Sequence, residues 1–440
     1  MDLHGMLCTM LPLHSRPTAL ILGGRGFLGG FIVSALLKRG WQVKCLVRPQ
    51  GRTLTSTEVP GDLSEMLLPE DWHQALEGVC VVVNAAGILR EEHGQSFDDI
   101  HYQAPLALAL ACAERDIRFV QLSALGHPED GPFIASKHRF DEMLMTLPVQ
   151  AIALRPSVVY SHSGSYGGTS LLRALAAFPG RHLLPGEGAW LLQPVNAEDL
   201  AEVVASACLQ GKKGIYEVGC ESPITLHRYQ ELWRQWLRIP GKRAVHVPKA
   251  LVEIQVRFGE ALGRGPVGMT MWRMLQRGNM TASGEHKRVK DAFGVHARSL
   301  ESVLDTQPSQ SQDRWSAQLY FLGPWLKWSM VVLWMWSALV GLLTPAHDIL
   351  ALTQGSWLEM MHPVALARGS ALLDLGLAFG LIVARKPRWI VLAMIASVAA
   401  YLATFGIAHP KAMMDPLGGL VKNIALLPAL AVLWVLVERR

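Results

Sequence analysis

The chain has 440 residues, of which 50% are hydrophobic and 18% are charged, and its formal net charge is +5. This length is sufficient for more than one domain, and a mild positive charge without a recognised motif argues against nucleic-acid binding. Charges mix with apolar runs up to about residue 300, whereas long apolar runs dominate beyond residue 320. We therefore expect a part that folds in water, followed by a part that lies in a lipid bilayer.

The N-terminal segment and the spacing of cysteine and histidine argue against several other classes. Residues 1–17 lack a basic n-region and a full apolar core, so we expect an N-terminal tail rather than a signal peptide. The six cysteines lie far apart without a C-x-x-C pair, which predicts reduced thiols. The sixteen histidines form no H-E-x-x-H motif and no cysteine–histidine cluster, so no metal site is predicted.

Short apolar segments alternate with helical patterns through the first part of the chain. The segments with the pattern of buried strands are 18–22, 41–47, 79–87, 118–126 and 150–159. This alternation predicts the α/β class, with a doubly wound parallel Rossmann sheet. Residues 160–300 also contain glycine-rich loops with aromatic residues, SGSYGGTS and LLPGEGAW.

The most specific motif lies between the first strand and the first helix, where the sequence reads GGRGFLG. Small residues let the backbone turn tightly and approach a pyrophosphate, and the helix N-terminus offers N–H groups and the positive end of its dipole. We therefore predict nucleotide binding by this loop, whose residues are Gly23, Gly24, Arg25, Gly26, Phe27, Leu28 and Gly29.

The ends of the following strands supply the other candidates for cofactor binding. The second strand ends in CLVRP, with Arg48 where NAD-binding proteins usually place a carboxylate. Together with Arg25, this guanidinium suits a 2′-phosphate, which favours NADP(H) over NAD(H). Asp62 and Leu63 follow the third strand, where a carboxylate can accept a hydrogen bond from adenine or serve as a turn residue. The strand that ends in NAAG adds Asn84, Ala85, Ala86 and Gly87 at the carboxyl edge of the sheet.

Taken together, these motifs resemble an extended or atypical short-chain dehydrogenase/reductase. The resemblance covers roughly residues 18–300 and rests on GGRGFLG, GDL, NAAG, VQLSALG, FIASK, LRPSVVY and QPVNAEDLAEVV, in that order. It is strongest to the branch that includes the NADPH-binding accessory subunit of respiratory complex I. The resemblance implies an NAD-dependent epimerase/dehydratase-like oxidoreductase domain over residues 18–304, with a small substrate-binding region mainly within 160–300. Some members of the branch perform no known chemistry.

The same resemblance assigns the catalytic positions, with one departure. Ser123 matches the serine that hydrogen-bonds the substrate oxygen, and Lys137 matches the lysine that holds the nicotinamide ribose and assists the catalytic tyrosine. Phe133 stands where that tyrosine belongs, and its ring has no hydroxyl to donate. A positioned general acid is worth roughly 10²–10⁴-fold in rate, so its loss leaves two alternatives open. Either another group or the nature of the acceptor compensates, or the domain binds NADPH without chemistry.

Four apolar segments follow a polar linker at residues 305–316. They lie near 322–343, 364–384, 388–407 and 419–437, and each is close to the ~20 residues needed to cross a bilayer. Residues 317–440 resemble a DoxX-like four-helix membrane domain, chiefly through MDPLGGLVKNIALLPALAVLW. Some relatives of that kind are linked to quinone-coupled redox chemistry, so the resemblance implies a quinone as one acceptor to consider.

The charges between the apolar segments predict an orientation. Basic residues in ARKPRW and VERR fall on one side together with Lys327, so the positive-inside rule puts both termini and the nucleotide domain in the cytoplasm. This predicts a multi-pass protein of a bacterial-type inner membrane. Within the second span, Asp374 is costly in lipid, and Lys422 opens the fourth span and is a candidate partner. The two residues form either a quinone, proton or lipid-headgroup site, or a structural contact that fixes helix packing.

From these features we expect a membrane-anchored, NADPH-preferring oxidoreductase that acts on a membrane-associated acceptor such as a quinone or a lipid carbonyl. The alternative is a non-catalytic NADPH-binding protein with a structural, sensing or assembly role in a membrane redox complex. No nucleic-acid partner is expected.

Overall fold

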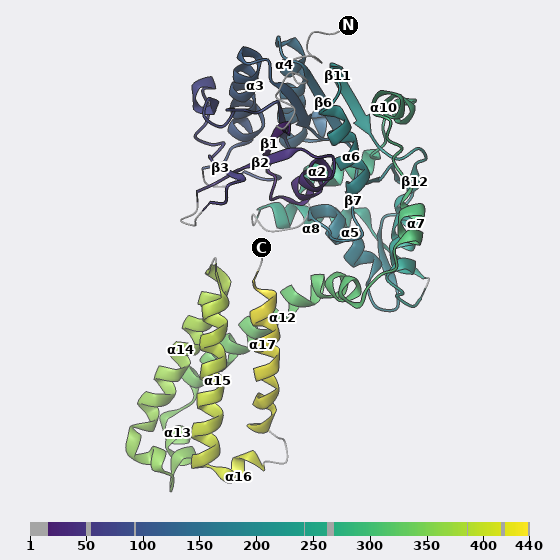
Figure 1. Ribbon diagram of the computed structural model, residues 1–440. Coiled ribbons are helices and arrows are strands. Elements are labelled where there is room, and N and C mark those ends of the chain that lie inside the picture. The colour runs from purple at the N-terminus through teal and green to yellow at the C-terminus, as the bar shows by residue number, and fades with distance from the viewer. Residues whose placement is uncertain are drawn as a thin grey trace. The chain divides into compact units, whose positions relative to one another are not determined.

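The computed structural model describes residues 16–49, 54–91, 94–241, 243–261, 268–384, 386–414 and 419–438. The predicted N-terminal tail, residues 1–17, therefore lies almost wholly outside the described residues. The chain forms two compact units, of which the first ends at Ala317 and the second begins at Gln318. Figure 1 shows a sheet with covering helices in the first unit and a bundle of helices in the second.

Within the described part of the first unit, seven strands form one parallel sheet in the order β11-β6-β5-β4-β1-β2-β3. The direction of winding reverses at β1, which pairs with β2 on one side and with β4 on the other. The predicted α/β class and doubly wound parallel sheet are confirmed. The strands are β1 (Thr18–Leu22), β2 (Gln42–Val47), β3 (Glu58–Pro60), β4 (Val81–Asn84), β5 (Arg118–Leu122), β6 (Ala151–Pro156) and β11 (Gly214–Val218).

The apolar run of β1 is explained by helices on both faces of the sheet. Alternate residues of a strand point to opposite faces, and every residue from Ala19 to Leu22 is fully buried. On one face Ala19 and Ile21 pack among α2 (Phe27–Lys38), α6 (Ala197–Ala207) and α10 (Glu285–Phe293). On the other face Leu20 and Leu22 pack among α3 (Ala104–Glu114) and α4 (Pro132–Thr146). Figure 1 shows this arrangement of helices around the strands.

A separate hydrophobic cluster forms beyond residue 160, around Tyr160 and Trp233, whose rings meet edge to face at 6.1 Å. Its helices are α5 (Gly167–Ala176), α7 (Leu226–Trp236) and α11 (Leu300–Thr306). Shorter elements complete the unit: β7 (Val159–Tyr160), β8 (His182–Pro185), β9 (Leu191–Leu192), β10 (Val195–Asn196), β12 (Ile224–Thr225), β13 (Ala244–Val247), α8 (Lys249–Ala261), α9 (Met269–Arg277), and the single-turn helices Pro69–Trp72, Asp99–Gln103 and Pro128–Asp130.

The predicted linker at 305–316 is shorter than expected. Helix α11 extends to Thr306, and α12 (Ser311–Leu343) begins at Ser311, so residues 307–310 alone separate the two helices. These four residues are fixed because the Trp236 indole donates to the Gln307 carbonyl and the Ser309 hydroxyl donates to the Trp236 carbonyl. The Asp313 carboxylate then accepts from the Gln310 N–H at 2.8 Å, which caps the start of α12.

Among the described residues of the second unit, three helices are long and apolar enough to cross a membrane: α12, α14 (Pro363–Val383) and α15 (Arg388–Ala408). They expose large apolar side chains such as Trp336, Phe379 and Ile407, as expected of helices that face lipid. The remaining helices are α13 (Ala346–Thr353), α16 (Pro410–Met413), α17 (Leu426–Leu436) and the 3₁₀ segments Trp357–Met361 and Val421–Ala425.

The fourth predicted span, residues 419–437, is not one spanning helix. It consists of the 3₁₀ segment Val421–Ala425 and the 11-residue α17. Pro428 lies in the first turn of α17, where a proline is tolerated because the first N–H groups have no partner within the helix. The same missing N–H prevents the α-helical bond that would join α17 to the turn before it.

Candidate functional site

The carboxyl ends of β1 and β4 mark the place where an open α/β sheet binds ligands. These strands are neighbours at the point where the strand order reverses, and their following loops diverge to opposite faces. The glycine loop follows β1, and the NAAG segment follows β4. The fold therefore brings together two motifs that lie about sixty residues apart in the sequence.

Glycines in the loop after β1 are required by close backbone contacts. Gly23 has a φ of +73°, and a Cβ there would lie 2.8 Å from the Ala85 carbonyl oxygen. A Cβ on Gly24 would lie 2.6 Å from Cys45 Sγ, and one on Gly29 would lie 2.0 Å from the Gly23 carbonyl oxygen. The start of α2 consequently packs directly on the loop that precedes it.

The N-terminus of α2 has the chemistry to hold an anion. Its N-cap is Gly26, which offers no side-chain oxygen to the first N–H groups. Those N–H groups have no partner within the helix, and the positive end of the helix dipole lies there as well. Phe27 and Leu28 begin the helix at this point. The loop and the helix N-terminus therefore fit a pyrophosphate, as in dinucleotide-binding folds.

The two arginines predicted to hold a 2′-phosphate already contact carboxylates. Arg25 forms an ion pair with Glu58 of β3, whose side chain is almost fully buried. Arg48 Nε lies 3.8 Å from Asp62 Oδ2, and about half of the Arg48 side chain is exposed. The sequence analysis did not single out Glu58, because the residue stands at the start of a short strand rather than at a strand end.

Asp62 is a turn residue in this structure. Its Oδ1 accepts the Ser64 N–H at 3.0 Å and the Ser64 hydroxyl at 2.8 Å. The neighbouring Leu63 packs against the core on the α3–α4 face of the sheet. One carboxylate oxygen of Asp62 is therefore used locally, whereas the other faces Arg48.

The NAAG turn brings the second group of predicted residues to the same edge. Asn84 donates to Gln121 Oε1 at 2.9 Å and accepts from the Ala86 N–H at 3.2 Å, so its side chain fixes the turn. Ala85 lies against Gly23, as described above. A Cβ on Gly87 would lie 3.3 Å from both His101 Nε2 and Lys137 Nζ. Gly87 thus marks the point where the turn meets α4.

Lys137 is a buried cation beside this turn. Its side chain is 5% exposed, and its Nζ donates to the Leu122 carbonyl at the end of β5 at 3.2 Å. Burial lowers the pKa of Lys137 to about 8, while the charge of Asp141 opposes that shift. The Phe133 ring centroid lies 6.0 Å from Nζ, so the ring is close to the lysine but brings no hydroxyl.

His101 is a site residue that the sequence analysis missed. It lies on the π-helix Asp99–Gln103, an irregular helix type that is frequent at functional sites. Its Nε2 accepts the Ile88 N–H at 3.0 Å, so Nδ1 carries the proton and donates to Ser136 Oγ at 2.9 Å. Ser136 in turn donates to the Phe133 carbonyl at 3.1 Å. Burial, followed by the charge of Lys137, lowers the pKa of His101 to about 2, so the imidazole is neutral.

The neighbours of Phe133 are aromatic or already hydrogen-bonded. The Phe133 ring meets the His101 ring at 5.5 Å and the Phe97 ring at 6.3 Å, both edge to face. Because His101 donates to Ser136 and Ser136 donates to the Phe133 carbonyl, neither has a proton to offer a substrate in this geometry. Lys137 is the ionisable neighbour whose pKa lies close to a physiological pH.

Ser123 hydrogen-bonds away from the predicted substrate position. Its hydroxyl donates to Asp141 Oδ2 at 2.7 Å, and the same oxygen accepts from Arg155 Nε at 2.7 Å. Asp141 is completely buried, and burial raises its pKa against the opposing effect of Arg155. In this arrangement the serine helps to satisfy a buried carboxylate.

In the second unit, Asp374 accepts a hydrogen bond from the Ser337 hydroxyl of α12 at 2.7 Å. This contact joins α12 to α14, which is the structural role considered for Asp374 in the sequence. Lys422 lies in the 3₁₀ segment before α17, and its contact with Asp374 stays a prediction. Closer to the start of α14, Arg368 donates to the carbonyls of Gly341 and Thr344 at the end of α12.

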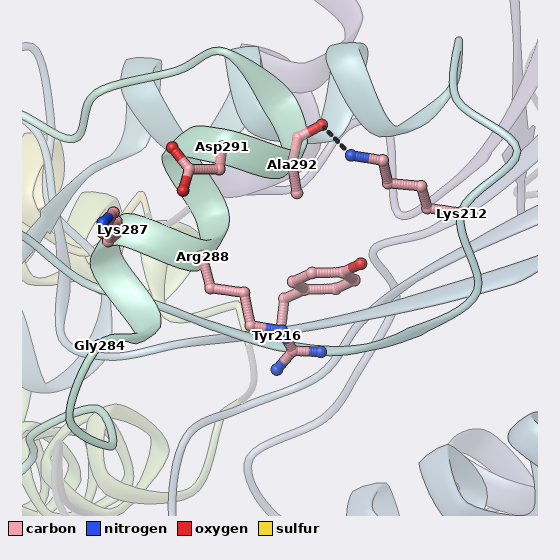
Figure 2. A pocket seen from close by; sticks show the side chains of 7 residues that line it. All are labelled: Lys212, Tyr216, Gly284, Lys287, Arg288, Asp291 and Ala292. Atoms are coloured by element: carbon pink, nitrogen blue, oxygen red, sulfur yellow. Dashed lines mark hydrogen bonds between the residues drawn. The ribbon is translucent and has the colours of Figure 1, made fainter.

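A pocket of about 450 Å³ lies elsewhere, between β11 and α10 (Figure 2). Its lining contains residues of neither the glycine loop nor the NAAG turn. The lining residues are Lys212, Tyr216, Gly284, Lys287, Arg288, Asp291 and Ala292. Arg288 stacks on Tyr216 and donates to Glu285 at 2.8 Å, so its charge is already balanced locally. We therefore place the functional site at the β1–β4 edge rather than in this pocket.

Two protein families match the chain in separate regions. Residues 19–219 match the NAD dependent epimerase/dehydratase family, and residues 331–433 match the DoxX-like family. The chain therefore combines an epimerase/dehydratase-type Rossmann domain with a DoxX-like helical membrane domain. This confirms the resemblance on which the sequence analysis relied.

Individual relatives are distant. Subunit 9 of the NADH dehydrogenase (ubiquinone) 1 alpha subcomplex from Arabidopsis thaliana mitochondria is 26% identical over 54% of this chain. A ceramide reductase from Caulobacter vibrioides is 26% identical over 46% of this chain. In each case the matched region spans 65% of the relative. The match to the X-ray structure of Pal from Bacillus thuringiensis covers 66% of this chain and 96% of the Pal chain, with a TM-score of 0.50 and 16% identity. This similarity shows a shared fold.

Replacing Gly29 by alanine is expected to weaken NADPH binding by tenfold or more, because the new Cβ would lie 2.0 Å from the Gly23 carbonyl oxygen. The matched control is Gly30→Ala on the next residue of the same helix, where a Cβ would meet no described atom within 4 Å. The measurement is the Kd of NADPH for the full chain in detergent. Equal affinities for the two variants would contradict the proposed role of the loop.

Replacing Lys137 by methionine is expected to stabilise the first unit near neutral pH. Below pH 8 the lysine is charged in both the folded and the unfolded state, so the full cost of burying the charge applies. The pKa of Lys137 is about 8 in the folded protein and 10.5 in the unfolded chain, so that cost is on the order of 3 kcal/mol. The folded protein releases the proton first as pH rises, so the advantage of the variant should shrink between about pH 8 and 10.5.

Thermal unfolding of the full chain in detergent across this pH range checks the expectation. The exposed Lys38→Met serves as the control and should leave the unfolding midpoint almost unchanged. A Lys137→Met protein that is less stable than wild type at every pH would show that the buried charge contributes net stability.

Proposed function

We propose that this chain, an epimerase/dehydratase-type Rossmann domain joined to a DoxX-like membrane domain, is an NADPH-dependent reductase of a membrane-associated acceptor. The observation that carries the proposal is the position of Lys137. Its ammonium group borders Gly87 at the edge of the sheet to which the glycine loop also belongs. A lysine kept at this point, at the expense of burying a charge, is expected when the group contacts a cofactor.

The residues of the site would have different roles in such a reaction. The glycine loop and the N-terminus of α2 would hold the pyrophosphate, and Lys137 would hold the nicotinamide ribose. When bound, the dinucleotide supplies a hydride. Reduction of a carbonyl leaves an alkoxide, and its proton would come from the Lys137 ammonium, whose pKa of about 8 suits a general acid near neutral pH. Water would then restore the proton to Lys137.

The acceptor is proposed to be a lipid carbonyl or a quinone. The DoxX-like domain carries three helices of spanning length among its described residues, so the enzyme meets substrates that are dissolved in lipid. The relative named ceramide reductase supports a lipid carbonyl. The rings of Phe133 and Phe97 give the site an apolar wall, which suits a hydrophobic substrate.

The orientation in the membrane is part of the proposal. Arg388 at the start of α15 pairs with Glu438 near the C-terminus at 2.8 Å, so these basic segments lie at the same end of the bundle. The positive-inside rule then supports a cytoplasmic C-terminus in a bacterial-type inner membrane. A cytoplasmic nucleotide domain would have access to NADPH.

A preference for NADPH over NADH is proposed to depend on Arg48. The charge of Arg25 is neutralised by Glu58. Arg48, by contrast, is about half-exposed, and its contact with Asp62 Oδ2 is long, at 3.8 Å. A guanidinium of this kind can turn to a 2′-phosphate, which NADH lacks. Replacing Arg48 by alanine is therefore expected to weaken NADPH binding about tenfold and to leave NADH binding nearly unchanged.

The Kd values of both nucleotides, measured for wild type and Arg48→Ala, check this preference. Arg39→Ala is the control, because Arg39 is a partly exposed arginine of the same unit that pairs with Glu202. A tighter binding of NADH than of NADPH by the wild-type protein would overturn the preference and leave the rest of the proposal standing.

A second candidate is an NADPH-binding protein without chemistry. Two observations favour it: Phe133 has no hydroxyl, and the Ser123 hydroxyl is hydrogen-bonded to Asp141. The relative in the alpha subcomplex of NADH dehydrogenase supports a place in a membrane redox complex. In this role the bound nucleotide would stabilise the fold or report on the redox state.

The rate of exchange of bound NADPH distinguishes the two candidates without knowledge of the acceptor. Labelled nucleotide is added to the full chain in detergent, and its uptake is followed. Enzymes typically turn over about 1–10³ times per second, so exchange within seconds is expected for the reductase. Exchange over hours would exclude NADPH as a dissociating cosubstrate and would favour the second candidate.

Restoring the hydroxyl tests the chemistry itself. Phe133→Tyr is expected to raise the rate of NADPH oxidation by ten- to a hundredfold with a suitable acceptor, because the new hydroxyl would lie near Lys137. Phe97→Tyr, on the ring that packs against Phe133, is the matched control and should give no such gain. Equal rates for wild type and Phe133→Tyr would indicate a substitute proton donor if both proteins oxidise NADPH, and no chemistry if neither does.

A further inference from the structure

Three potential metal ligands that are far apart in the sequence meet on the surface of the first unit. Glu221 follows β11, His286 is the second residue of α10, and His296 lies in the loop after α10. The three candidate ligand atoms, one from each residue, all lie within 4.8 Å of one another. The two imidazole rings stand edge to face with centroids 5.0 Å apart. The spacing of these residues in the sequence does not predict the cluster, because Glu221 and His286 lie 65 positions apart.

The segment that carries Glu221 and the segment before α10 are held by the same side chain, that of Gln193. The Gln193 amide donates to the Cys220 carbonyl at 3.0 Å, and its oxygen accepts the Thr281 N–H at 2.6 Å, just before α10. The N-terminus of α10 is tied to β11 by reciprocal bonds. Glu285 accepts the Glu217 N–H at 3.0 Å, and Glu217 accepts the Ala282 N–H at 2.7 Å. The position of His286 relative to the loop that bears Glu221 is therefore fixed.

The far end of α10 is anchored as well. Ser206 donates to the Phe293 carbonyl at 2.7 Å, and Figure 2 shows Lys212 reaching the Ala292 carbonyl at the same end of the helix. Two residues beyond His296, Arg298 binds Asp199 through its backbone N–H at 2.8 Å and through its guanidinium. Because these segments are already fixed, the three ligands would lose little conformational entropy when they bind an ion.

The hydrogen bond of His286 has the form found behind metal-binding imidazoles. Its Nδ1 lies 3.3 Å from the Gly219 carbonyl oxygen, which can only accept, so the proton is on Nδ1 and the lone pair is on Nε2. Metal-bound histidines usually donate their second ring nitrogen to a carbonyl or carboxylate in the same manner. Because its ligand atom lies within 4.8 Å of that of His286 in the first turn of α10, the carboxylate of Glu221 would also offset the positive end of the α10 dipole.

We propose that Glu221, His286 and His296 bind one divalent transition-metal ion, with Zn²⁺ as the expected occupant. Two imidazole nitrogens and one carboxylate oxygen form a ligand set that Zn²⁺ accepts in tetrahedral geometry, with water at the fourth position. A hard ion such as Mg²⁺ is disfavoured, because it requires oxygen ligands in octahedral geometry. The ion would clamp α10 to the loop after β11, and none of its three ligands belongs to the glycine loop or the NAAG turn.

The test is titration of the full chain in detergent, first freed of metal by chelation, with Zn²⁺ and then with Co²⁺. One equivalent of Zn²⁺ is expected to bind with micromolar affinity or better, and Co²⁺ is expected to give visible absorption bands of a four- or five-coordinate site. His286→Ala, His296→Gln and Glu221→Gln should each weaken Zn²⁺ binding by at least tenfold and abolish the Co²⁺ bands. NADPH binding, measured in parallel, reports that each variant is folded.

The matched control is His73→Ala, which removes a histidine beside the Glu114 carboxylate, 3.6 Å away, outside the cluster. This variant should bind Zn²⁺ as the wild type does. Three outcomes would overturn the proposal: an adventitious ion only, revealed by equal Zn²⁺ binding in all variants; no Zn²⁺ binding at micromolar concentration; or loss of the Co²⁺ bands in His73→Ala alone.

Discussion

The close approach of the first helix to the loop before it is the contact on which the nucleotide site depends. A Cβ at Gly29 would lie 2.0 Å from the Gly23 carbonyl oxygen, so the helix can start where it does only with glycine at that position. The same loop lies against Ala85 at the end of β4. The loops after β1 and β4, on either side of the strand-order reversal, are thereby held together beside the N-terminus of α2.

Everything else at the site is arranged around a buried cation. Lys137 reaches the carboxyl edge of the sheet from α4, and the groups around it are neutral or backbone: the His101 imidazole, the Gly87 backbone and the Leu122 carbonyl. The charge that opposes its deprotonation is that of Asp141, which is itself held by Arg155 and Ser123. The serine, the carboxylate and the lysine therefore act as one electrostatic system. Phe133 affects this system through its apolar ring, not through a proton.

The features that the sequence predicts well are those that short-range physics determines. Alternating apolar runs locate β1, β2, β4, β5 and β6, and the glycine spacing locates the start of α2, because both patterns reflect the geometry of neighbouring residues. The fourth apolar segment shows the limit of this reasoning. Its hydrophobicity extends over residues 419–437, but its first turn is the 3₁₀ segment Val421–Ala425, and the α-helix that follows has 11 residues.

Features that depend on contacts between distant segments cannot be predicted from the pattern of neighbouring residues. The π-helix that carries His101, the ion pair of Arg25 with Glu58, and the cluster of Glu221 with two histidines are all created by tertiary packing. The Ser123 hydroxyl is the most instructive case. A family motif predicts that it faces a substrate, whereas the buried charge of Asp141 demands a hydrogen bond from it. Arg155 donates to the same oxygen, so the serine is one of two donors that satisfy the buried carboxylate. The proposed reaction therefore takes its proton from the Lys137 ammonium group rather than from Ser123.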